Sequence, residues 1–334
     1  MAKRLTKESI INKSGKRINQ GKLEVLKQKN FICLSEAASG DAPKDIIKIY
    51  EYGRSKRSNK KTWVKYIAKI GHKWYPNESI TEHYLTQLGK SFEINIANSK
   101  VVFAEDKIRF LSEHFHSNDQ SLEHGANILS RYLNEQDTIW LDEMDKDRSL
   151  KKEINIIDIS KAIDHIFKND SEFIQNDMVH MLLFDALTGN NDRHYYNWGI
   201  ITHIKNKHHP YFSPIYDTAR GLLWNFNDQK VIHLYSSLCK GNNKAFINYV
   251  NNSKPKIAIP HNSDCNHFEL IEFLNKNDFI KLEHKQNWSD TKNLEKAIKI
   301  LNKEFKHLFT EDRKFLIKEI LTARFNRLRQ ILIH

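Results

Sequence analysis

The residues with the clearest chemical potential are GNNDRHYYNWG, at positions 189–199, which place an acid, two bases and three amides between two glycines. A second acid, Asp217, follows in SPIYDTARG, after the segments GIITHI and YFSPIY. These segments are typical of two strands around a polar turn, so the hairpin would hold Asp192 and Asp217 at one end of a cleft. Such a group suits phosphoryl transfer, because Mg²⁺ takes oxygen ligands and an attacking hydroxyl needs a proton acceptor.

Each polar residue of this loop has a candidate role. Asp192 is the candidate base, Asn197 and Asp217 are candidate metal ligands, and Arg193 and His194 would support the loop or the developing phosphate charge. Taken alone, the loop is better explained as a polar turn than as an active site, because Asp and Asn side chains often satisfy nearby backbone amides. The chemical interpretation therefore depends on partners elsewhere in the chain.

A candidate phosphate-binding loop lies upstream, in ASGDAPK at residues 38–44. Ser39, Gly40 and Lys44 come directly before a predicted strand, and a short loop of this kind can direct backbone N–H groups at phosphate oxygens. The segment matches neither GxxxxGK[ST] nor GxGxxG, so an ordinary turn remains the alternative.

A cationic partner for phosphates is predicted on the next strand. Lys69 lies in YIAKIG, and Glu78 or Glu82 on the following helix could hold it in place. A lysine on a strand followed by a glutamate on a helix is common, so it is the order of all these motifs that favours a nucleotide site.

The surrounding sequence predicts a β-rich segment followed by a helical one. Residues 34–115 indicate β, β, α, β, β: a hairpin around the basic run 54–61, a helix over 77–89 that Gly89 ends, and two strands within 99–115. Beyond these, the apolar spacing predicts helices at 122–134, 157–168 and 171–187, a helix carrying Leu294 to Leu308, and a last helix capped by Thr310.

The ordered motifs SGDAPK, YIAKIG, NESITEHYLTQLG, FLSEHF, GNNDRHYYNWG and SPIYDTARG resemble the HipA-like serine/threonine kinases, in particular their short bacterial, CtkA-like forms. The resemblance covers roughly residues 34–225. It implies an α+β, two-lobed protein-kinase-like fold with a small β-rich N-lobe and a mainly helical C-lobe. The implied division is a basic N-terminal arm at 1–33, an ATP-binding N-lobe at 34–117 and a C-lobe at 118–334.

The resemblance also assigns roles by position. It implies ATP and Mg²⁺ as cofactors, with Asp192 as catalytic aspartate, His194 and Arg193 in the same loop, and Asn197 and Asp217 as magnesium ligands. The implied ATP-binding residues are Ser39, Gly40, Lys44, Lys69, Glu78 (with Glu82 as the alternative), and Glu113 and Phe115 of the hinge at 110–115. Ala37 stands where relatives often carry an autophosphorylated serine, so Ser39 and Ser35 are the remaining candidates.

The implied activity is transfer of the ATP γ-phosphate to Ser or Thr of a protein, in a toxin or an effector. An antitoxin-like or host protein is the candidate regulatory partner. This sequence begins only about 35 residues before the phosphate loop, and its basic residues 1–29 are expected to be a flexible tail. Its first 22 residues lack an apolar core for a Sec signal, and no run of about 18 apolar residues predicts a membrane span, so we expect a cytoplasmic protein unless another route delivers it.

Composition leaves two other functions open. The chain has a formal charge of +12 and three cysteines, Cys33, Cys239 and Cys265, that form no disulfide framework. The positive charge suits an anionic membrane, so a phosphoinositide kinase is one alternative. The other is a non-enzymatic nucleic-acid-binding module in which Tyr195, Tyr196 and Trp198 stack on bases, although packing against the core explains these rings better. A zinc site at His203, His208 and His209 has no usual ligand spacing.

Overall fold

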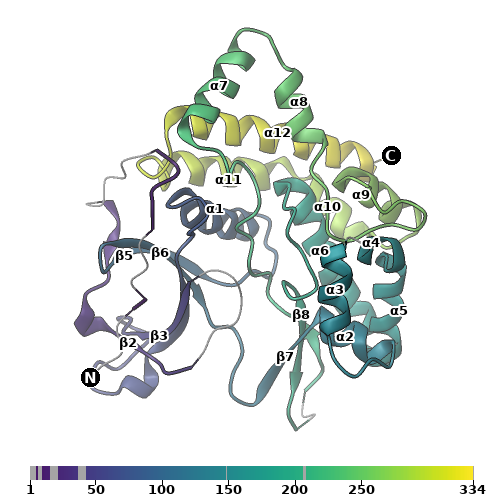
Figure 1. Cartoon of the computed structure of the whole chain (residues 1–334), viewed down its shortest axis with the longest axis horizontal. Helices are drawn as coiled ribbons and strands as arrows, with labels where there is room; N and C mark the ends of the chain where they lie inside the picture. The colour runs from purple at the N-terminus through teal and green to yellow at the C-terminus, as the bar shows by residue number, and fades with distance from the viewer. Residues whose placement is uncertain are drawn as a thin grey trace.

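The computed structural model describes residues 5–6, 10–15, 22–36, 43–147, 149–205 and 208–333. The chain forms two lobes, one built on a curled β-sheet and the other mainly helical (Figure 1). The expected mixed α+β architecture is therefore confirmed.

The N-lobe is a six-stranded sheet with the order β1-β5-β6-β4-β3-β2. Its strands are β1 (Glu24–Val25), β2 (Phe31–Cys33), β3 (Lys44–Ile49), β4 (Val64–Lys69), β5 (Ser99–Ala104) and β6 (Lys107–Glu113). β3 pairs with β4 and β5 with β6, both antiparallel, as the two predicted hairpins require. The β5–β6 turn has positive φ at Glu105 and Asp106, which matches the twist of a two-residue hairpin loop.

Two segments of residues 1–33 are strands of this sheet and others pack on the protein, which contradicts the expected flexible tail. β1 pairs in parallel with β5, and β2 pairs with β3. Leu5, Leu26 and Phe31 are buried in the core of the lobe, and Thr6 donates two hydrogen bonds to Asp45. These apolar residues are widely spaced among lysines, so their burial has no regular period that the sequence could show.

Helix α1 (Asn77–Ser91) connects β4 to β5 and packs against β5, β6 and the C-lobe helix α11 (Thr291–Lys303). The predicted start after Pro76 is confirmed, but Gly89 does not end the helix. A Cβ at Gly89 would lie 2.9 Å from Ile96 Cδ1, so this glycine allows close packing inside the helix. The prediction was wrong because a glycine serves helix ends and close contacts equally well.

The helices of the C-lobe are α2 (Gly125–Tyr132), α3 (Ile139–Asp147), α4 (Leu150–Glu153), α5 (Ile156–Phe167), α6 (Ser171–Thr188), α7 (Asp228–Cys239), α8 (Lys244–Asn251), α9 (His267–Lys276), α10 (Leu282–Ser289), α11 and α12 (Glu311–Ile333). Helix α6 is buried along most of its length and contacts α5, α9 and α12. Thr310 Oγ1 accepts a hydrogen bond from Arg313 N, which confirms the predicted cap of α12. α11 ends at Lys303, earlier than predicted, although Phe305 and Leu308 remain buried beyond it.

A small three-stranded sheet lies next to residues 189–198, the candidate catalytic loop. It has the order β7-β8-β9, from β7 (Gln120–His124), β8 (Gly199–His203) and β9 (Tyr211–Phe212). The predicted hairpin of GIITHI and YFSPIY is confirmed as β8 and β9. The helix predicted over 122–134 begins only at Gly125, because residues 120–124 pair with β8 instead.

Candidate active site

The catalytic loop, residues 189–198, connects the end of α6 to the start of β8. Gly189 ends α6 with a φ of 68°, a left-handed conformation that glycine adopts without strain. Asn197 Nδ2 donates to the Asp192 carbonyl over 2.8 Å, and His194 N donates to the same oxygen over 2.9 Å. The loop is therefore folded on itself around Asp192, whose side chain is 36% exposed.

Arg193 points into the core of the C-lobe rather than toward a substrate. Its side chain is 1% exposed, and Nε and Nη2 donate to both carboxylate oxygens of Asp185 on α6, over 2.8 and 2.9 Å. Nη1 donates to the carbonyls of Asn197 and Tyr216, both over 2.7 Å. We call this group the arginine clamp; it fastens the catalytic loop and the segment before Asp217 to one helix.

Asp185, which none of the sequence motifs includes, accepts a further hydrogen bond. Asn190 Nδ2 donates to its Oδ1 over 2.9 Å, while Asn190 Oδ1 accepts from the backbone N of Asp192. Burial opposes ionisation of Arg193, but the Asp185 carboxylate outweighs it and raises the pKa of Arg193. The pair is thus hydrogen-bonded through both carboxylate oxygens and all three guanidinium nitrogens, as a buried ion pair must be to be tolerated.

A second charged group, the lysine cluster, lies between the lobes. Lys69 Nζ on β4 is 3.1 Å from Glu82 Oε1 on α1 and 3.1 Å from Asp217 Oδ1. Burial opposes ionisation of Asp217, but Lys69 lowers its pKa to about 2. For Glu82 burial is the larger effect and, with the charge of Asp217, raises its pKa to about 7 despite Lys69.

The partner of Lys69 on α1 is Glu82, the alternative choice, and not Glu78. Glu78 Oε2 accepts a hydrogen bond from Trp74 N, and its Oε1 lies 3.9 Å from Arg220 Nη2. Residues four apart lie on the same face of a helix, so spacing alone could not separate the two glutamates.

The two candidate oxygen donors, Asn197 and Asp217, have the chemistry that a magnesium ion needs. Asn197 uses its amide nitrogen within the loop, which leaves the amide oxygen as the end suited to a metal, and Asp217 is a partly exposed, ionised carboxylate. Mg²⁺ commonly takes one or two protein oxygens and completes its shell with phosphates and water. Within the described residues, His203 and His208 included, no group of three or more His, Cys, Asp or Glu side chains is suited to a metal ion.

Most of the predicted phosphate loop lies outside the described residues. Ser39 and Gly40 lie outside the described residues, whereas Ser35 is exposed and Lys44 begins β3, directly opposite Lys69 in the strand register. The charge of Lys44 also contributes to the lowered pKa of Asp217. Lys44 therefore lies close enough to the lysine cluster to share its electrostatic field.

The predicted hinge joins the lobes at the end of β6. Glu113 forms a two-pronged ion pair with Arg54, over 2.6 and 3.1 Å, and its backbone N donates to Asn98 O. The ring of Phe115 lies 5.5 Å from that of Tyr216, the residue before Asp217. The hinge thus contacts the segment that carries the candidate metal ligand.

The aromatic residues of the catalytic loop mostly face the core, as expected from packing. Tyr195 and Trp198 are 4% and 1% exposed, and Trp198 stacks on Phe212. A Cβ at Gly125 would lie 2.3 Å from the Trp198 ring, so the indole fills the space above this glycine. Neither Tyr195 nor Trp198 is available to stack on nucleic-acid bases.

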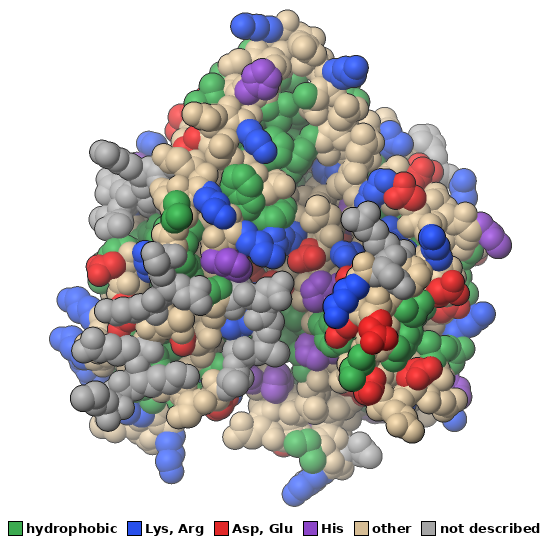
Figure 2. Space-filling model, in the orientation of Figure 1, with side chains coloured by type: hydrophobic (Ala, Val, Ile, Leu, Met, Phe, Trp, Pro, Cys, Tyr) green, Lys and Arg blue, Asp and Glu red, His purple; other side chains and the backbone are tan. Residues whose placement is uncertain are grey.

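A pocket of about 440 Å³ opens beside Asp192. It is lined by the catalytic loop, by Arg220 and Trp224, which follow Asp217 in the chain, and by Asp142 and Asp145 of α3. Basic, acidic and histidine side chains gather at the centre of this face (Figure 2). Burial lowers the pKa of His194, which also lines the pocket, so its imidazole is neutral at pH 7.

Comparison with known families decides what this chain is related to. A family model described as the HipA-like C-terminal domain matches residues 36–269, well over half of the chain. The chain belongs to this family. The HipA-like match includes Lys69, Glu82, the catalytic loop and Asp217, and so covers both charged clusters.

One solved structure confirms the fold of this HipA-like chain. It is similar to the Helicobacter pylori proinflammatory kinase CtkA, with a TM-score of 0.67 and 16% identity over 90% of this chain and 95% of that one. The Shewanella oneidensis MR-1 toxin–antitoxin protein HipA, solved with HipB and operator DNA, aligns with a TM-score of 0.47 and 14% identity over 89% of this chain and 65% of that one. No sequence match was found among curated proteins.

Proposed function

We propose that this HipA-like protein is an ATP- and Mg²⁺-dependent serine/threonine protein kinase. The observation that carries the proposal is Lys69, held 3.1 Å from both Glu82 and Asp217, with the Asp192 loop fastened to the same segment through Arg193. Membership of the HipA-like family and the fold shared with CtkA support it.

The nucleotide would bind between the lobes. The ammonium group of Lys69 would contact phosphate oxygens while Glu82 keeps it in place, and Asn197 and Asp217 would hold magnesium, which neutralises phosphate charge. Two carboxylates face one lysine here, so the group carries net negative charge whenever Glu82 is ionised. This excess attracts a cation to the position where a nucleotide's metal is needed.

The acceptor would enter the pocket beside Asp192. Its hydroxyl oxygen forms the new bond to the γ-phosphorus while the bond to the ADP oxygen breaks, and Asp192 accepts the hydroxyl proton. Because this carboxylate is partly exposed at the pocket, a serine or threonine side chain on a protein segment can reach it. Autophosphorylation of Ser35, which is exposed, or of Ser39 is part of the same proposal.

The deciding experiment measures transfer of the γ-phosphate from labelled ATP to a protein acceptor, with Asp192→Ala compared with wild type. We expect loss of a general base to reduce transfer by about 10²- to 10⁴-fold. Asp264→Asn is the matched control, since Asp264 is an exposed acid that pairs with Lys254 away from the pocket.

Wild-type rates in the Asp192→Ala variant would remove Asp192 from this role. Parallel assays with phosphoinositide vesicles test the acceptor class, and labelling of lipid in place of protein would contradict the proposal. Phosphopeptide mapping after incubation with ATP tests Ser35 and Ser39, and modification of neither would refute autophosphorylation. Expression of wild type against Asp192→Ala tests a role as a toxin, for which growth arrest must depend on Asp192.

A further inference from the structure

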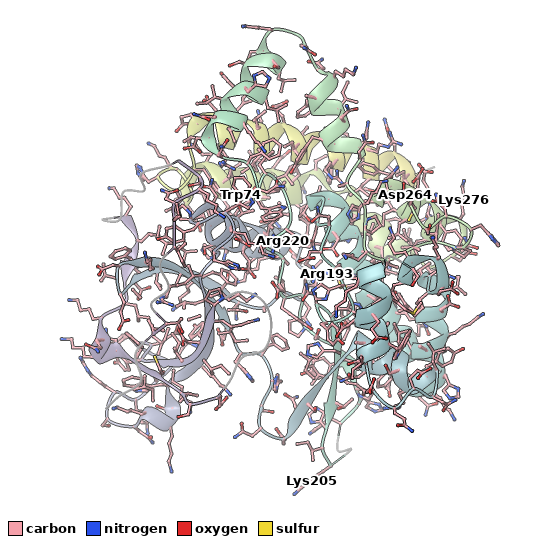
Figure 3. The ribbon with its side chains drawn as sticks, viewed as in Figure 1. Trp74, Arg193, Lys205, Arg220, Asp264 and Lys276 are labelled. Carbon is pink, nitrogen blue, oxygen red and sulfur yellow. The ribbon has the colours of Figure 1, made fainter. Side chains whose placement is uncertain are left out.

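Arg220 connects both lobes of the site, although none of the motifs above gave it a role. It follows Asp217 by three residues, and its guanidinium lies 4.0 Å from the centre of the Trp224 ring. Nε is 3.5 Å from Asp192 Oδ2, and Nη2 is 3.9 Å from Glu78 Oε1. The side chain is 18% exposed and lines the pocket, at the junction of the lobes in Figure 3.

Glu78 gives this arginine a fixed anchor on the N-lobe. Its side chain is 7% exposed, and Trp74 N donates to its Oε2 over 3.2 Å. The backbone N of Glu78 in turn donates to Trp74 O, and a Cβ at Gly71 would lie 2.6 Å from Glu78 Cβ. The chain before α1 therefore wraps closely around Glu78 and limits its movement.

Helix α1 thus presents two glutamates, one turn apart, to two different cations. Glu82 contacts Lys69 on the nucleotide side, and Glu78 faces Arg220 on the acceptor side. Arg220 in turn faces the Asp192 carboxylate. One rigid helix is therefore linked to both halves of the site.

We propose that Arg220 is a positioning residue for Asp192, with Glu78 and Trp224 holding its guanidinium in place. The inference rests on the proposed kinase function. A partly exposed carboxylate on a loop samples several rotamers, and a fixed cation on one side favours the orientation that faces the pocket. The 3.5 Å separation is longer than a good hydrogen bond, so Asp192 keeps its ability to accept a proton from the acceptor.

The alternative is an ion pair that stabilises the junction of the lobes and has no effect on the chemistry. Partly exposed pairs of this kind often contribute little to stability. Kinetic measurements distinguish the two roles. Substitution of a positioning residue lowers kcat for the acceptor reaction and leaves KM for ATP almost unchanged. Substitution of a residue in a stabilising pair shifts only the unfolding transition.

The test measures kcat, KM for ATP and the unfolding midpoint for Arg220→Ala, Arg220→Lys and Glu78→Gln. We expect Arg220→Ala to lower kcat by roughly 10- to 100-fold, the effect of misplacing a reacting group, with KM for ATP within about twofold. Arg220→Lys keeps the charge and should recover part of the rate. Because the two residues act in series, Glu78→Gln combined with Arg220→Ala should be no worse than Arg220→Ala alone.

Arg131→Ala is the matched control, since Arg131 also has a carboxylate partner, Glu123 at 3.1 Å, and an aromatic neighbour, Phe167. It lies outside the pocket lining and should keep the wild-type rate. If Arg220→Ala does not fold, Arg220→Lys and Glu78→Gln decide the question.

A wild-type kcat in Arg220→Ala would overturn the inference while leaving the proposed function intact. If Arg220→Ala does not fold, a wild-type kcat in both Arg220→Lys and Glu78→Gln would do the same. A raised KM for ATP with unchanged kcat would also overturn it, by making Arg220 a nucleotide-binding residue. Failure of the wild-type protein itself to transfer phosphate would refute the proposed function, and the role of Arg220 with it.

Discussion

The lysine cluster and the arginine clamp are both groups of buried or half-buried charge, yet they are neutralised in different ways. In the clamp, one guanidinium faces one carboxylate, and its other donors go to the carbonyls of Asn197 and Tyr216. In the cluster, Lys69 faces two carboxylates, and Asp217 is partly exposed. The two groups meet in the chain at Tyr216 and Asp217.

This difference indicates a structural role for the arginine clamp and a ligand-binding role for the lysine cluster. A balanced and fully hydrogen-bonded pair has little to gain from a ligand, so the clamp is suited to hold backbone in place. The lysine cluster has one more carboxylate than ammonium groups, and its two carboxylates have shifted pKa values, one raised and one lowered. Such a cluster is suited to bind a cation and phosphates. Substitutions in the clamp should therefore affect folding first, and substitutions in the cluster should affect transfer first.

The largest effect is expected for Asp217→Asn in the lysine cluster. The substitution removes the negative charge that pairs with Lys69 and that would, in the proposed mechanism, hold the metal, so phosphate transfer should fall by about 10³-fold or more. The folded structure should persist, because Lys69 keeps Glu82. Transfer rates measured across a magnesium titration check this expectation. A wild-type rate at saturating magnesium would show that the lysine cluster is not more important for transfer than the arginine clamp.

Arg193→Met in the arginine clamp should destabilise the protein by about 3–5 kcal/mol, because it leaves Asp185 buried without its partner. Urea unfolding followed by circular dichroism measures the change. Arg193→Met combined with Asp185→Leu removes both charges and should recover much of this stability without recovering activity. An Arg193→Met protein as stable as wild type would contradict the supporting role of the clamp.

Glu82→Gln should have the opposite balance, lowering transfer while raising stability. Folding raises the pKa of Glu82 from 4.5 to about 7, so ionisation of this carboxyl costs stability that is lost as pH rises from about 4.5 to 7 and stays lost above it. The free energy of unfolding should therefore rise on the order of 1–3 kcal/mol at pH 8, and the gain should shrink as pH falls toward 4.5. A loss of stability at pH 8 would show that the Lys69 pair outweighs burial.

The smallest effect concerns acid unfolding. Folding lowers the pKa of Asp217 from 3.8 to about 2, so its contribution to stability is present above pH 4 and is lost as pH falls toward 2. Asp217→Asn removes this contribution, and its stability should fall less steeply with acid than that of wild type. Chemical unfolding at several pH values between 2 and 5 measures the two slopes, and identical slopes would contradict the assignment.

Much of the fold could be predicted because its signals are local. The hairpin of β5 and β6, the buried helix α6 ending at Gly189, and β8 after the catalytic loop all follow from apolar spacing and from turn residues beside them. The strand β7 could not be predicted, because its residues have a helical spacing and only pairing with β8 makes them a strand.

The sequence by itself determined the order of the motifs and the residue types that phosphoryl transfer needs, because both are properties of neighbouring residues. Only the tertiary structure decided that Lys69 pairs with Glu82, that Arg193 turns inward to Asp185, and that Arg220 spans Glu78 and Asp192. Two glutamates on one helix face, or two arginines beside one loop, are equivalent by spacing. Their partners are chosen by burial, which makes an unpaired charge costly and so fixes which groups must meet.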